Sequence, residues 1–166
     1  VPPTGEGKWQ PAPGDKALFP YWGKVRTFAN HNDQLKTLDP PIYSTAPGSR
    51  YYRDFAEVNK AVTLKEGQQY WMAEFWSDDI VGLSFSPPAR LFAIANQIIV
   101  IENIDLETTL HLYCKLGIAE NDGAVAAWKA KYEYNVERPF HYIRKYINSE
   151  FRPLLGEAIG VPGLTP

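Results

Sequence analysis

The chain has 166 residues, of which 45% are hydrophobic and 14% aromatic, and its formal net charge at pH 7 is −2. This length and composition predict one domain with one sizeable hydrophobic core. The near-neutral charge argues against a general nucleic-acid-binding surface, and no apolar stretch approaches the roughly 18 residues that a membrane span requires.

Residues 1–48 are rich in proline and glycine and lack helical periodicity. They also carry large aromatic side chains, namely Trp9, Phe19, Tyr21, Trp22 and Phe28. Side chains of this kind need burial, which argues against disorder. We therefore expect an extended arm that packs on a folded core.

Helical character begins at Ser49. Apolar residues recur at spacings of three and four over residues 52–62, which predicts a first helix. The stretch 63–66 has the pattern of a capping box, with Thr63 and Glu66 at its ends. A second helix is therefore predicted to begin there and to run through Trp76.

Three further helices follow. Ser86 and the two prolines after it predict the start of a helix that runs to residue 101. Asp105 is expected to cap a long helix over residues 106–132, which we interpret as continuous because its apolar periodicity keeps phase. A break near residues 120–123 is the alternative. The last helix is predicted to begin at Pro139, to turn Ile143 and Ile147 inward, and to be ended by Arg152 and Pro153.

No strand-like alternation is sustained anywhere in the sequence. The predicted fold is therefore all-α, a helical bundle with an extended N-terminal arm rich in proline and aromatic residues. The arm is assigned to residues 1–48 and the helical domain to residues 49–166. The single cysteine, Cys114, lies on an apolar helical face and is predicted to be buried and inert.

Lys131 and Arg138 lie about two helical turns apart, and Pro139 follows the arginine. The pattern predicts that one helix ends at Asn135 and the next begins at Pro139, which places Arg138 at a helix N-terminus. Two cations beside unpaired backbone N–H groups repel one another unless an anion lies between them. The motif thus predicts an oxyanion site for phosphate, sulfate or vanadate, with two ordinary solvated cations as the alternative.

This motif resembles the first signature of the phosphatidic acid phosphatase and vanadium haloperoxidase superfamily. The flanking residues 126–132 and 138–144 look like the bacterial secreted haloperoxidase-like branch, and so do residues 75–78. Short aromatic stretches of the arm match more loosely. The resemblance extends over most of the chain and implies a secreted or periplasmic location.

The resemblance also implies roles for individual residues. Lys131 and Arg138 would each contact oxygens of a bound phosphate or vanadate. Trp128 is similar to a residue that lines the halide pocket, and His141 follows Arg138 closely enough to line the same pocket. A packed or exposed histidine is the alternative for His141. No pattern of histidines or cysteines predicts a metal site.

The chain departs from the superfamily in lacking its second signature, Pro-Ser-Gly-His, and its third, which carries the nucleophilic histidine. The three histidines, His31, His111 and His141, do not follow Ser-Gly. The chain therefore resembles the amino-terminal part of an enzyme, with no complete catalytic set. Its expected partner is a downstream segment that carries Ser-Gly-His and the nucleophilic histidine, and alone it should bind oxyanions weakly and turn over nothing.

Two classes of function remain open from the sequence. One is part of an enzyme, either a hydrolase of phosphoesters or an oxidoreductase that uses vanadate and peroxide to oxidise halides. The other is a non-catalytic helical module for interaction or assembly, and its partner could be a second copy of the same chain, as in a homo-oligomer. The ligand in the first class is a small oxyanion or phosphoester.

Overall fold

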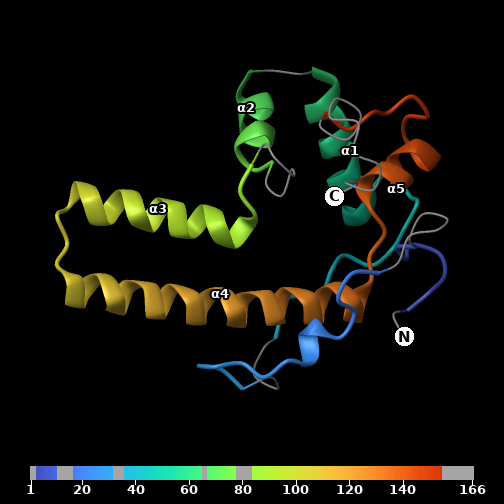
Figure 1. The fold of residues 1–166 in the computed structure, drawn as a ribbon. Coiled ribbons are helices and arrows are strands. Elements are labelled where there is room, and N and C mark those ends of the chain that lie inside the picture. The colour runs from blue at the N-terminus through green and yellow to red at the C-terminus, as the bar shows by residue number, and fades with distance from the viewer. Residues whose placement is uncertain (1–2, 11–16, 32–35, 65–66, 78–83, 155–166) are drawn as a thin grey trace. The chain divides into compact units, whose positions relative to one another are not determined.

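The structure is a computed structural model of the chain, and it describes residues 3–10, 17–31, 36–64, 67–77 and 84–154. These residues form five α-helices and one short 3-10 helix, and they contain no strand beyond an isolated bridge between Lys8 and Val136 (Figure 1). The all-α prediction is confirmed. No helix among the described residues has the length and apolar character needed to cross a membrane.

The helices lie close to where the sequence predicts them, except that the last one ends at Tyr146 and not at Arg152. The chain turns there, and the Phe151 N–H donates to the Asn148 carbonyl at 3.0 Å. The helices are η1 (Trp22–Lys24), α1 (Arg50–Leu64), α2 (Gly67–Phe75), α3 (Pro87–Ile101), α4 (Leu106–Tyr134) and α5 (Pro139–Tyr146). α4 is continuous through residues 120–123, so the alternative of a break there is excluded.

Contacts divide the chain into two compact units. Unit 1 comprises Val1–Leu18, Leu38–Trp76 and Lys131–Pro166, and unit 2 comprises Phe19–Thr37 and Ser77–Ala130. Each unit thus combines part of the N-terminal region with helices that come much later in the chain. The assignment of residues 1–48 to an arm and residues 49–166 to a helical domain stays a prediction.

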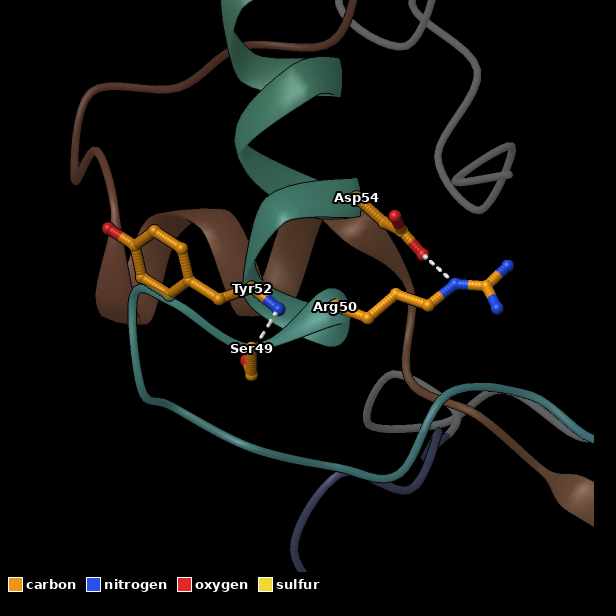
Figure 2. A network of polar contacts seen from close by, with 4 residues as sticks. All are labelled: Ser49, Arg50, Tyr52 and Asp54. Atoms are coloured by element: carbon orange, nitrogen blue, oxygen red, sulfur yellow. Dashed lines mark hydrogen bonds and ion pairs between the residues drawn. The ribbon is translucent and has the colours of Figure 1, made fainter.

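The first turn of α1 is closed by Ser49, as Figure 2 shows. Its hydroxyl oxygen accepts a hydrogen bond from the Tyr52 backbone N–H at 3.1 Å and donates one to the Ala46 carbonyl at 2.7 Å. Arg50 and Asp54, one turn apart on the exposed face, form an ion pair at 3.8 Å. The serine satisfies a backbone donor that the helix leaves open, whereas an exposed pair of this kind adds little stability.

The core of unit 1 lies between α1 and α5 and is mainly aromatic. Tyr51 and Phe55 of α1 pack on Tyr142, whose ring lies 5.2 Å and 4.6 Å from theirs between centroids. Tyr142 and Ile143 are completely buried, and Phe151 completes the cluster. α5 has only eight residues, so this packing rather than its own propensity holds it in the helical state.

In unit 2, α3 and α4 run side by side in opposite directions, joined by residues 102–105 (Figure 1). Asp105 caps α4 as predicted, since its carboxylate accepts the Thr108 backbone N–H at 2.9 Å and the Thr108 hydroxyl at 2.8 Å. The rings of Phe92 and Tyr113 stack between the helices, with centroids 5.7 Å apart. Much of the apolar surface of this hairpin is exposed, including Ile101 and Leu106.

A carboxylate on α4 holds the first part of unit 2 in place. Asp122 is buried and accepts hydrogen bonds from the backbone N–H groups of Phe28 and Ala29 at 2.8 Å and of Asn30 at 3.2 Å. The bond from Phe28 is the largest cause of a lowered Asp122 pKa, which falls to about 2. The charged form of Asp122 is therefore the form that binds this segment.

We expect acid to release residues 28–30 from Asp122. Because the folded pKa lies below the usual value, the contribution of Asp122 is complete above about pH 4 and is lost as the pH falls through about 2. The measurement is an NMR titration of the Phe28, Ala29 and Asn30 amide protons. Asp122→Asn should abolish their common acid transition, and a transition that persists in this variant would contradict the assignment.

Gly23 allows η1 to lie directly on α4. A Cβ atom at residue 23 would lie 2.5 Å from Lys129 Cα and 2.6 Å from its backbone nitrogen. Beside this contact the rings of Trp22 and Trp128 pack at 4.7 Å between centroids. A side chain at position 23 would therefore push η1 away from the helix backbone.

Gly23→Ala is expected to lower the free energy of unfolding of unit 2 by about 1–3 kcal/mol, because backbone atoms must move to admit the methyl group. Gly123→Ala is the matched control. Nothing lies within 4 Å of a Cβ atom there, and alanine in a helix interior should raise stability by up to about 1 kcal/mol. Urea unfolding followed by circular dichroism checks both, and changes of equal sign would contradict the contact.

Three predictions from the sequence are wrong, and two of them concern burial. Phe19, Tyr21 and Phe28 were expected to be buried but are exposed. Of these neighbouring aromatic residues, it is Trp22 that packs on α4, through the ring of Trp128. Cys114 is also exposed, because it lies on the side of α4 that the described residues leave uncovered.

The predicted capping box also fails at its first residue. Thr63 lies inside α1, and its hydroxyl donates to the Asn59 carbonyl at 2.7 Å, one turn back along the same helix. It therefore belongs to the end of one helix and not to the start of the next. Glu66, the other end of the predicted box, lies outside the described residues.

Candidate functional site

The two candidate cations lie on either side of a single turn in unit 1. Lys131 is in the last turn of α4, which ends at Tyr134. Asn135 then leaves the helix with φ of +46°, in the left-handed region, while its backbone N–H still donates to the Lys131 carbonyl at 3.0 Å. The predicted end of the helix at Asn135 is confirmed, and asparagine is among the few residues that adopt this backbone readily.

Arg138 is the residue from which α5 begins. Its backbone is extended, with φ of −76° and ψ of 146°, and Pro139 occupies the first helical position. The Arg138 carbonyl accepts the backbone N–H of His141 at 3.1 Å, which closes the first turn. Proline suits this position because its fixed φ is helical and its missing N–H would have no partner there.

The turn between the cations is held by residues from the start of the chain. The Trp9 N–H donates to the Asn135 carbonyl at 2.9 Å, and the Glu137 N–H donates to the Gly7 carbonyl at 3.0 Å. The Lys8 ammonium donates to the Tyr134 carbonyl at 2.8 Å. This carbonyl belongs to the last turn of α4, where a cation also interacts favourably with the helix dipole.

The turn brings two like charges near one another, with Lys131 exposed and Arg138 half-buried. Burial lowers the pKa of Lys131, and the positive charge of Arg138 lowers it further. Burial also lowers the pKa of Arg138, which is half-buried. Among the described residues, no carboxylate lies within ion-pair distance of the Arg138 guanidinium. Both shifts mean that the surroundings disfavour the positive charges, and an anion placed between the two groups would offset this cost.

Tyr132 and Glu137 lie close to the two cations in sequence, and their side chains form hydrogen bonds with other residues of unit 1. The Tyr132 hydroxyl donates to the Leu18 carbonyl at 2.5 Å. The Glu137 carboxylate faces the Tyr51 hydroxyl at 3.5 Å, at the edge of the α1–α5 core, and its pKa is raised by burial. The carboxylate nearest in sequence to Arg138 is therefore directed toward the core of unit 1.

His141 and Trp128 occupy different surroundings. His141 lies in the first turn of α5, is exposed, and places its ring 5.4 Å from that of Phe140. Trp128 lies three residues before Lys131 in α4 but belongs to unit 2, where it packs on Trp22. Pocket-lining roles for both residues stay predictions. The described residues contain no group of three or more side chains suited to hold a metal ion.

Sequence reasoning missed the residues that hold this turn. Asn135 was recognised as the end of a helix, but its side-chain bonds to the arm were not predicted, nor was the bond from Lys8 to Tyr134. The helix end and the later proline were the available local signals. The pairing with residues 3–9 has no local signal, because the partners are more than a hundred residues apart.

Two comparisons with known proteins find similarities to this chain. A family model described as the VCPO second helical-bundle domain matches residues 111–158, which include both cations. The fold is similar to that of a crystal structure described as the first bacterial vanadium-dependent iodoperoxidase, with a TM-score of 0.80 and 30% sequence identity over 91% of this chain. No curated protein sequence matches significantly.

The chain spans 39% of the length of that iodoperoxidase. The family model covers most of α4, the turn after it and α5, and these segments carry Lys131 and Arg138. Both matches support the resemblance to the vanadium haloperoxidase superfamily that the sequence motif indicates.

Proposed function

We propose that this chain supplies part of an oxyanion site, in which Lys131 and Arg138 bind vanadate or phosphate. The observation that carries the proposal is the placement of two cations, an exposed Lys131 and a half-buried Arg138, on either side of one hydrogen-bonded turn. They are close enough for the charge of Arg138 to lower the pKa of Lys131. The likeness to a vanadium-dependent iodoperoxidase supports vanadate as the ligand.

The donor set fits a tetrahedral oxyanion. The Arg138 guanidinium offers a planar fork of N–H donors that can bind two oxygens, and the Lys131 ammonium offers a compact charge to a third. Their chemical role is electrostatic, since both donors stabilise the negative charge that grows on the equatorial oxygens of a trigonal-bipyramidal arrangement. Bound vanadate would supply the activation of peroxide for halide oxidation, whereas phosphate would enter as part of a phosphoester substrate.

Catalysis in this proposal needs groups from a further segment. A covalent step requires a nucleophile with an orienting partner, and none of the three histidines follows Ser-Gly. We propose a downstream segment that carries Ser-Gly-His and the nucleophilic histidine. The whole enzyme is then a haloperoxidase or a phosphoesterase, and the secreted branch that the motif resembles suggests a secreted or periplasmic location.

Anion binding to the 166-residue chain tests the proposal. Orthovanadate and inorganic phosphate are titrated separately, and binding is followed by vanadium-51 and phosphorus-31 NMR. We expect weak binding, in the millimolar range, because the site has few donors and is open to water. Lys131→Ala and Arg138→Ala should each abolish the measurable binding.

The matched controls are Lys115→Ala, an exposed lysine on α4, and Arg53→Ala, an exposed arginine on α1. Both should bind the anions as the unaltered chain does. Equal losses in all four variants would mean that binding reflects net charge alone. That result would favour the alternative of a helical interaction module without an oxyanion site.

A further inference from the structure

Asn135 makes more contacts than a helix end requires. It is 4% exposed, and its side-chain amide donates to the Pro3 carbonyl at 2.6 Å and to the Trp9 carbonyl at 3.0 Å. Its own backbone carbonyl accepts the Trp9 N–H at 2.9 Å. One buried residue therefore forms three hydrogen bonds to the first part of the chain.

The backbone of Asn135 alone does not explain this side chain. A residue with φ of +46° after a helix is commonly glycine, which adopts the left-handed region without strain. Asparagine is tolerated there as well, but only its carboxamide reaches the two carbonyls of the arm. The Asn135 side chain thus binds the start of the chain, and its left-handed backbone ends the helix.

These hydrogen bonds hold the short segment that lies between the two candidate cations. Residues 135–137 are each joined to the arm, through the Asn135 bonds, the bridge between Lys8 and Val136, and the Glu137 bond to Gly7. Arg138 is the next residue, and Lys131 lies one turn before Asn135. A shift of this short segment would move the guanidinium of Arg138 relative to the ammonium of Lys131.

We propose that Asn135 is a positioning residue: its carboxamide locks arm residues 3–9 onto the 135–137 turn and thereby fixes the distance between the Lys131 and Arg138 head groups. The role of that distance in binding an oxyanion rests on the function proposed above. The positioning itself does not, because the two charges interact whether or not an anion is present.

The Lys131 pKa reports this distance without any ligand. It is measured on the 166-residue chain by NMR titration of carbon-13-labelled lysine, with Lys131→Arg used to assign the signal. Arg138→Ala removes the like charge, so the Lys131 pKa should rise. Asn135→Gly keeps the left-handed backbone but removes the carboxamide, and it should raise the Lys131 pKa by part of the same amount.

Asn103→Gly is the matched control. Asn103 also follows a helix with a positive φ, of +49°, but it is exposed and lies in unit 2. It should leave the Lys131 pKa unchanged. An unmoved pKa in Asn135→Gly would overturn the proposal, and so would an equal rise in Asn135→Gly and Asn103→Gly.

A milder change covers the case in which Asn135→Gly does not fold. Deletion of residues 1–5 removes the Pro3 carbonyl and leaves the Trp9 bonds, so it should raise the Lys131 pKa less in the same direction. An unchanged pKa after this deletion would then overturn the proposal.

Vanadate titration separates this proposal from the proposed function. If the site binds vanadate, Asn135→Gly should weaken binding severalfold, with helix content by circular dichroism unchanged. If the unaltered chain binds no vanadate but the Lys131 pKa responds as expected, the oxyanion function fails while the positioning role is supported.

Discussion

Replacing Tyr142 with alanine should lower the free energy of unfolding of unit 1 by about 3–5 kcal/mol. The residue is fully buried, its ring stacks on Phe55 and meets Tyr51 edge-on, and its loss would leave a cavity between α1 and α5. Because a total stability of about 5–15 kcal/mol is typical of a domain, most of the structure of α5 would be lost with it. Urea unfolding followed by circular dichroism gives the measurement.

Tyr142→Phe is the matched control for this prediction. It keeps the ring but removes the hydroxyl, which donates to the Ser44 carbonyl at 2.6 Å. The expected loss is about 1 kcal/mol, the usual contribution of one such hydrogen bond. If both variants were destabilised equally, the hydroxyl rather than the ring packing would hold the core together.

The second large effect concerns catalysis. In a polypeptide that joins this chain to the proposed downstream segment, Arg138→Ala should lower kcat about 10²- to 10³-fold, or roughly 3–4 kcal/mol of transition-state stabilisation. Lys131→Ala should have an effect of similar size, because in the proposed site each cation would stabilise charge that develops on the same group. Steady-state rates of halide oxidation and of phosphoester hydrolysis, measured separately, provide the test and identify the reaction.

Controls for the catalytic prediction are Lys115→Ala and the conservative Arg138→Lys. The first should retain full activity, since Lys115 is an exposed residue in the middle of α4. The second keeps the charge but loses the bidentate fork, so it should fall between the unaltered enzyme and Arg138→Ala. Full activity in Arg138→Ala would remove Arg138 from the site.

The isolated 166 residues should turn over neither substrate. A rate that persisted after repurification would show that one of the histidines in this chain acts as a nucleophile. His141 would be the first candidate, because it lies exposed in the turn that follows Arg138. His141→Ala would then abolish the rate.

Local signals were sufficient to predict that each helix exists, where α3, α4 and α5 begin, and where α4 ends. The carboxylate of Asp105, the prolines that open α3 and α5, and the helix end at Asn135 all act within a few residues of the feature they determine. Interactions of this range are encoded in neighbouring residues, which is why a sequence pattern predicts them.

Contacts across long stretches of sequence were not predictable in the same way. Asp122 reads as an ordinary charged residue in a helix, yet it binds three backbone N–H groups that lie more than ninety residues earlier. Burial was also misjudged, because Phe19 and Cys114 are apolar by type but exposed in the described structure. Residue type states a preference for burial, whereas the packing of other segments decides whether that preference is met.

The sequence by itself determined that Lys131 lies in the last turn of one helix and that Arg138 directly precedes the next. Helix propensity, the left-handed Asn135 and the ring of Pro139 all act locally. Only the tertiary structure decided how near the two charges come. That distance depends on hydrogen bonds between the turn and residues 3–9, which form when the start of the chain folds back onto α4 and α5. Some of these bonds join backbone groups that every residue type carries, and the others join the Asn135 side chain to carbonyls more than a hundred residues earlier. No local pattern of side chains therefore predicts them.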